Sequence, residues 1–179
     1  MAAHFAAHFN EVHAITCKAV RQVPEHRKGF RPLPEIFTIF DLAFHMFSQE
    51  KVMLIGCRKG KVAWKDFERV EDDRRGLATI EDLVRYGEAI HQETSRWLAA
   101  ASREDLEKAV ETFCGPSTPE KLLASALEHI LHHRGQLYVY LRLMGIEPVF
   151  VWTGEPMPVV REKLSAISRQ QVAASPEEQ

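Results

Sequence analysis

Apolar side chains recur at three- and four-residue steps along most of this chain, which is the period of an α-helix and not of a strand. In the first such stretch, residues 3–23, Phe5, Phe9, Val12 and Val23 fall on one face. Similar patterns predict further helices over residues 35–57, 79–101, 117–144 and 161–172, with a short one after Ser102. The chain is therefore predicted to be mostly helical.

Local start and stop signals support these helices. Thr79-Ile-Glu-Asp82 and Ser102-Arg-Glu-Asp105 resemble capping boxes, with Asp in place of the usual Glu or Gln. Ser117-Thr-Pro-Glu120 combines a hydroxyl cap with a Pro near the first helical position. The helix that begins there is expected to end at Gly145, with Pro148 beyond it.

The connecting segments are distinct in composition. Residues 28–34 contain two prolines and predict an extended connector. Residues 58–78 are charged and carry glycines, which predicts a long loop with a short turn at 64–68. Residues 149–152 form an apolar run that is either strand-like or packed on the helices, and residues 175–179 are expected to be disordered.

Four long amphipathic helices with two long connectors predict an all-α four-helix bundle with short extra helices and negligible strand content. No repeat of 20 to 50 residues is present, so a solenoid is excluded. The 179 residues suit one domain of ordinary globular composition.

Composition narrows the function classes. The net charge of -2 argues against a nucleic-acid-binding surface, and no apolar run reaches the roughly 20 residues of a membrane helix. The three cysteines are far apart, which excludes a disulfide framework and suits a reducing compartment. The N-terminus lacks signal-peptide features. The sequence predicts a cytoplasmic protein that binds neither nucleic acid nor membrane.

Nine histidines are the unusual feature of the composition, and His129-Ile-Leu-His-His133 is the strongest local signal. Residues four apart share a helical face, so His129 and His133 can bind one metal ion from successive turns. Both lie on an apolar stripe with Leu122 and Leu137, whereas His132 falls at its edge. By spacing alone the pair is equally well explained as hydrogen-bonded core histidines.

The pair does not form the zincin motif, because Ile130 stands where that motif has Glu. A catalytic metal needs a third ligand. His45 is the candidate on the second helix, in a narrow sector with Thr38 and Asp41 opposite the apolar face. Such a sector faces either water or a polar site inside the bundle.

Other histidines compete less well for the third position. His91 lies on the core stripe of the third helix and is the reserve ligand or a pocket residue. His4 and His8 are close to the N-terminus, and His13 and His26 have no partner at useful spacing. These four are set aside.

Three stretches resemble the DinB/YfiT-like family of helical-bundle metalloproteins. They are the connector Phe30–Pro34, the segment Thr38–His45 with its single His, and the run Glu128-His-Ile-Leu-His-His-Arg-Gly-Gln that continues to Leu-Arg-Leu-Met-Gly145. The resemblance covers roughly residues 5–148. It implies a DinB-like bundle over residues 1–148 and a C-terminal extension over 149–179.

The resemblance also implies an up-down-down-up topology with one crossover connection and, commonly, a homodimer. It implies one divalent transition metal per chain held by His45, His129 and His133. Imidazole ligands do not fix the metal's identity; zinc and nickel are favoured, and iron also accepts them. The apolar segment 149–160 lies between prolines and is expected to pack on the bundle or across a symmetric partner.

Three neutral imidazoles leave the charge of the ion uncompensated, so an open position would prefer hydroxide or a thiolate. Gln136, at the rim of the same face, is a candidate for orienting a ligand or is an ordinary interfacial amide. Asp41 either accepts from an imidazole N–H or pairs with an arginine. Arg134 is expected at the surface, and Tyr140 in the pocket or the core.

Two functions from different classes remain open. The first is a metal-dependent enzyme that activates a thiol or water, similar to the family's thiol S-transferases or its proposed hydrolases, with a small-molecule substrate or a low-molecular-weight thiol as partner. The alternative is a non-catalytic, stress-associated module that binds a metal or a small ligand. No catalytic residue is assigned, because fold does not fix function.

Overall fold

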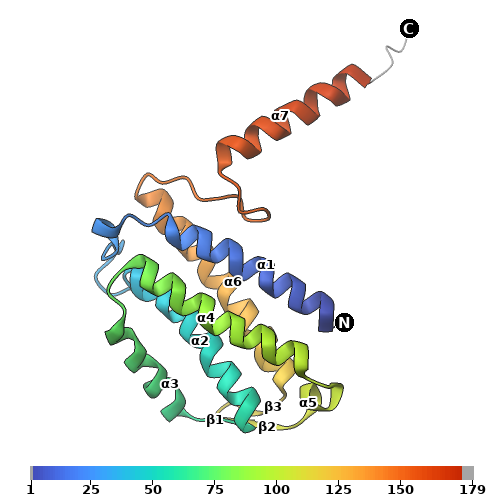
Figure 1. The fold of residues 1–179 in the computed structure, drawn as a ribbon. Helices are drawn as coiled ribbons and strands as arrows, with labels where there is room; N and C mark the ends of the chain where they lie inside the picture. Colours follow the sequence, from blue (N-terminus) through green and yellow to red (C-terminus); the bar gives the residue numbers. More distant parts are fainter. Residues whose placement is uncertain (1, 175–179) are drawn as a thin grey trace.

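Four long helices form the body of the protein in the computed structural model, which describes residues 2–174 and side chains from residue 4 to residue 167 (Figure 1). These helices are α1 (Ala2–Arg21), α2 (Ile39–Lys59), α4 (Ile80–Ala100) and α6 (Pro119–Leu143). In Figure 1, α2 and α4 run opposite to α1 and α6. The predicted all-α, up-down-down-up four-helix bundle is confirmed.

The helices pack in a ring in which α1 and α2 lie on a diagonal. Each of α1 and α2 packs against both α4 and α6. The core between them is apolar, and its largest fully buried side chains include Phe9, Phe47, Leu83, Ile130 and Leu141. Close packing reaches Gly87, where an added Cβ would lie 2.7 Å from the Phe47 ring. This core fixes how the inward faces of α2 and α6 meet.

The helix starts follow the predicted caps. The Thr79 hydroxyl accepts a hydrogen bond from the Asp82 amide, whose carboxylate accepts from the Thr79 amide in return. Thr118 caps α6 ahead of Pro119. The second helix begins at Ile39 and not at residue 35, because Thr38 supplies its N-cap. Ile36, inside the predicted range 35–57, lies outside the helix and is exposed.

Short elements fill the connections between the long helices. They are η1 (Glu25–Arg27), β1 (Lys61–Val62), α3 (Trp64–Glu71), η2 (Asp72–Gly76), α5 (Arg103–Glu107), β2 (Val110–Thr112) and β3 (Gly115–Ser117). Strand β2 pairs parallel to β1 and antiparallel to β3. The long loop predicted over residues 58–78 is therefore wrong in detail, since it holds β1, α3 and η2. Strand content is small, as expected.

The C-terminal segment first packs on the bundle and then leaves it. The Val149 amide donates to Gln22 Oε1 at 2.9 Å, and Gly154 lies against Lys18 and Ile15 of α1. The apolar run at 149–152 forms no strand; Val149 is buried against the bundle, whereas Trp152 is exposed. Helix α7 (Met157–Ala174) then projects away from the body (Figure 1). The expected disorder of residues 175–179 lies outside the described residues.

None of the helices that the structure describes is long and apolar enough to cross a membrane.

Candidate metal centre

The three predicted histidines meet between α2 and α6. The Nε2 atoms of His45 and His129 are 3.0 Å apart, and the His133 ring centroid lies 4.9 Å from that of His45 and 4.4 Å from that of His129. One ligand nitrogen from each ring falls within 4.8 Å of the other two. The polar sector that carries His45 thus faces the bundle interior, and each side chain is half-buried.

Burial keeps these imidazoles neutral. Desolvation lowers the pKa of His129 to about 3, with further lowering by the neighbouring histidines, led by His133. Desolvation also lowers the pKa of His45 and of His133. All three rings therefore offer a nitrogen lone pair at neutral pH, which is the form that binds a metal.

Gln136 fixes the orientation of His133. The Gln136 Oε1 atom lies 2.7 Å from His133 Nδ1, so the Nδ1–H donates and Nε2 keeps its lone pair. The Gln136 amide nitrogen reaches His132 Nε2 at 3.4 Å. His132 is exposed and does not join the group of three, as its position at the stripe edge predicted.

The donor set fits a divalent transition metal. Two imidazole nitrogens on one tetrahedral ion stand about 3.3 Å apart, given metal–nitrogen bonds of about 2.0–2.1 Å. The 3.0 Å between the His45 and His129 nitrogens is close to that value. The group holds three protein ligands among the described residues, which leaves a coordination position for an outside molecule.

A cleft of about 600 Å³ opens beside His133. Its walls come from the connector before α2, from the start of α2 and from α6, and they include Arg31, Phe37, Asp41, Gln136 and Tyr140. The Tyr140 hydroxyl donates to the Phe37 carbonyl at 3.2 Å, which ties the connector to α6. Tyr140 is thus both buried and part of the cleft wall.

The structure decides between the two roles expected for Asp41 and corrects the position expected for Arg134. Asp41 accepts from Arg74 Nε at 2.8 Å and from the Thr38 hydroxyl, so it pairs with an arginine and contacts no imidazole. Arg134, expected at the surface, is buried and lies 3.5 Å from the Val12 carbonyl oxygen. That expectation was wrong because α1 covers the face of α6 that carries Arg134.

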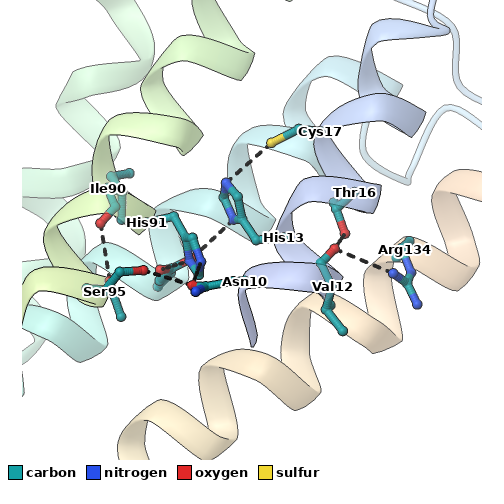
Figure 2. Close-up of polar contacts among 11 residues, drawn as sticks. Asn10, Val12, His13, Thr16, Cys17, Ile90, His91, Ser95 and Arg134 are labelled. Atoms are coloured by element: carbon teal, nitrogen blue, oxygen red, sulfur yellow. Dashed lines mark hydrogen bonds and ion pairs between the residues drawn. The ribbon is translucent and has the colours of Figure 1, made fainter. Parts of the chain in front are cut away.

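A second group of polar residues lies inside the bundle and was missed in the sequence. His91 Nδ1 is 2.9 Å from Glu50 Oε1, and His13 Nδ1 is 3.6 Å from Glu50 Oε2 (Figure 2). His13 was judged to have no partner, which is wrong. His91 points inward as expected but lies in this group, not with the three histidines. The available signal was helical spacing: Glu50 stands three residues after Phe47 and four before Leu54, so it shares their buried face of α2.

Cys17 also belongs to this second group. Its sulfur is 3.3 Å from His13 Nε2. Burial raises the pKa of the Cys17 thiol to about 12, so it stays protonated. Cys17 therefore contacts a histidine of the second group as a thiol.

Comparison with known proteins identifies the family. A family model described as "DinB family" matches residues 1–155. A curated relative, the uncharacterized protein YjoA of Bacillus subtilis, is 23% identical over 145 residues, which are 79% of this chain and 87% of the relative.

Solved structures of DinB-like proteins share the fold. The crystal structure of YjoA from Bacillus subtilis superposes with a TM-score of 0.68 at 21% identity, covering 84% of this chain and 99% of that one. A putative DinB family member from Exiguobacterium sibiricum gives 0.67 at 19% identity, over 80% of this chain and 91% of that one. A DinB-like protein from Bacillus cereus superposes with a TM-score of 0.65 at 18% identity, covering 80% of this chain and 93% of that one.

Proposed function

Because this chain belongs to the DinB family, we propose that it binds one divalent transition metal through His45, His129 and His133 and uses the site to activate a thiol or a water molecule. The observation that carries the proposal is the group of three neutral imidazoles beside an open cleft. A metal at such a site supplies Lewis acidity, which lowers the pKa of a coordinated water or thiol. Zinc and nickel are the metals we favour.

The surrounding residues have distinct tasks in this proposal. Gln136 holds His133 in the tautomer that presents Nε2, and such outer partners contribute strongly to metal affinity in other sites. The cleft gives a small molecule access beside His133. Its wall combines apolar groups such as Phe37 with the charged side chains of Arg31 and Asp41, so it suits an amphipathic ligand.

A thiol S-transfer or a hydrolysis is the reaction class that these features support best. An anionic thiolate or hydroxide compensates the charge that three neutral ligands leave on the ion. The alternative is a stress-associated module that holds a metal or a small ligand and performs no reaction. The two differ in whether bound metal is needed for turnover.

The test begins with metal content. Untagged protein is expected to carry about one equivalent at this site, and His129→Ala or His133→Ala to lose it, whereas His132→Ala, a matched exposed neighbour, retains it. The loaded protein is then assayed with panels of thiols plus electrophiles and of hydrolysable esters. Activity that chelation removes and metal restores supports the enzyme. Full metal loading without turnover, and a cobalt spectrum indifferent to thiols, would favour the binding module.

We also propose a homodimer, in the cytoplasm, with the exposed side chain of Trp152 and the projecting α7 as the parts open to a partner. Light scattering at micromolar concentration should give twice the mass of the chain. A monomer would exclude the dimer without affecting the metal proposal.

A further inference from the structure

The second polar group lies between α1, α2 and α4, apart from the three-histidine centre. His13 comes from α1, Glu50 from α2 and His91 from α4, and Figure 2 shows the two rings beside each other. The three are buried, and Glu50 has no exposed surface at all. One ligand atom from each lies within 4.8 Å of the other two.

The buried carboxylate of Glu50 needs a positive charge close to it. Among the described residues no lysine or arginine pairs with it; its ionic partners are His13 and His91 alone. The buried cation of α6, Arg134, is directed toward the Val12 carbonyl oxygen. The compensating charge must therefore come from a cation held within the group itself.

The outer contacts of the two rings decide which nitrogens face Glu50. His91 Nε2 is 2.9 Å from Asn10 Oδ1, which also accepts from the Ser95 hydroxyl. As Asn10 is oriented, His91 donates from Nε2, and its neutral form then has a lone pair on Nδ1. That lone pair faces a carboxylate oxygen at 2.9 Å.

His13 also faces Glu50 with its Nδ1. Its Nε2 lies 3.3 Å from Cys17 Sγ: with the thiol as donor the neutral ring carries its proton on Nδ1, and with the ring N–H as donor Nδ1 keeps its lone pair toward Glu50. His13 Nδ1 and Glu50 Oε2 are fully buried, and neither has a hydrogen-bond partner in the described part of the chain. In the second of these tautomers, two imidazole lone pairs converge on one carboxylate, while Asn10 and Cys17 contact the outer ring nitrogens. Metal-binding histidines show this arrangement of outer contacts.

We propose that His13, Glu50 and His91 form a second metal site, which binds a divalent transition metal through two imidazole nitrogens and one carboxylate. Two histidines and one carboxylate are a recognised ligand set for iron and related divalent ions. The carboxylate supplies a negative charge that the three-histidine centre lacks. The ligand set therefore favours ions that accept both nitrogen and oxygen, such as Fe²⁺, Co²⁺ or Zn²⁺.

Binding requires a small rearrangement of the rings. The His13 and His91 rings are stacked, with planes 5° apart and centroids 4.1 Å apart, so their nitrogen lone pairs lie in parallel planes. Each ring must turn toward Glu50 about its Cβ–Cγ bond to share one ion. That torsion has a broad energy profile in histidine, so the cost of the turn is set by the outer contacts with Asn10 and Cys17. Asn10 is exposed and gives an ion a short path from solvent.

The test separates this site from the three-histidine centre. The variant His45→Ala/His129→Ala/His133→Ala removes the first centre and is titrated with Co²⁺ after chelation, with bound metal measured by equilibrium dialysis and mass spectrometry. We expect one equivalent to remain bound, against two in the unaltered chain. Adding Glu50→Gln should reduce binding at least tenfold. Adding Glu93→Gln, an exposed glutamate of α4, should leave it unchanged.

Each outcome bears on the proposal. A folded triple variant that binds less than a tenth of an equivalent in excess Co²⁺ would overturn it, and the compensating cation would then be a proton on an imidazole. If Glu50→Gln fails to fold, the cobalt stoichiometries of the unaltered chain and of the triple variant still decide whether a second site exists. Anomalous scattering at the cobalt edge from Co²⁺-soaked crystals supplies a second measurement. A peak among the three side chains supports the site, and its absence at full cobalt occupancy elsewhere contradicts it.

Discussion

The bundle contains two histidine groups that differ in burial and in charge. The outer group, His45, His129 and His133, is half-buried beside a cleft and contains no acid. The inner group, His13, Glu50 and His91, is buried and built around one carboxylate. The outer group can exchange a ligand with solvent, whereas the inner group joins three helices.

The pKa shifts in the two groups differ because only the inner group contains a carboxylate. Desolvation disfavours the charged form of every member of the outer group, and repulsion from neighbouring histidines adds to it, most of all at His129. In the inner group, burial by itself would raise the pKa of Glu50, but the adjacent imidazoles of His13 and His91 lower it to about 2. A neutral outer group suits reversible binding, and a charged inner group suits holding the fold together.

The largest effect is expected from Glu50→Gln. Removing one partner of a buried ionic group typically costs about 3–5 kcal/mol, since the remaining groups stay buried without compensation. The free energy of unfolding, measured by urea denaturation of metal-free protein, should fall by about that amount. Glu93→Gln serves as the exposed control. Equal stability of the two variants would show that the inner group does not join the helices.

The pH dependence of stability should separate the two groups. Both folded pKa values lie below the unfolded ones, so the unfolded state binds protons more readily and stability falls as pH decreases. For His129 this loss runs from about 6.5 toward 3, and for Glu50 from about 4.5 toward 2.

Urea denaturation of chelator-treated protein across this range provides the measurement. His129→Asn should flatten the upper window alone, and Glu50→Gln the lower one. A profile that neither substitution changes would mean that other groups control acid stability.

His129→Ala should reduce metal affinity at the outer group at least 100-fold, about 3 kcal/mol, because two imidazoles bind an open-site metal poorly. The same variant should unfold at a urea concentration much closer to that of the unaltered protein than Glu50→Gln does. Isothermal titration with Zn²⁺ and urea denaturation provide the two measurements. A large loss of stability with unchanged affinity would reverse the roles that we assign to the groups.

Gln136→Leu should have the smallest effect. It removes the acceptor of the His133 Nδ1–H bond, and loss of such an outer partner typically lowers metal affinity about 10- to 100-fold. Unfolding should hardly change, because Gln136 is exposed. Gln92→Leu, an exposed glutamine of α4, is the control for surface effects. Equal affinities in the two variants would show that Gln136 does not position His133.

The sequence predicted the bundle because its signals are local. Apolar residues at helical steps predict the four long helices, and Thr79 and Thr118 act as the caps that their neighbours indicate. His129 and His133 were predicted to share a site from their spacing, because residues four apart in a helix lie on the same face. His45 was a candidate from its polar sector on the second helix, the family resemblance then favoured it, and its role as a ligand stays a prediction.

The tertiary structure decided what depends on contacts between distant segments. His13, Glu50 and His91 stand 37 and 41 positions apart and share no local pattern, so only the packing of α1 and α4 against α2 and its neighbours brings them together. Arg134 is buried for the same kind of reason, because α1 covers its face of α6. Helical periodicity determines the direction in which a side chain points from its own helix axis. The packing of neighbouring helices determines whether that side chain contacts water, a ligand or a buried carboxylate.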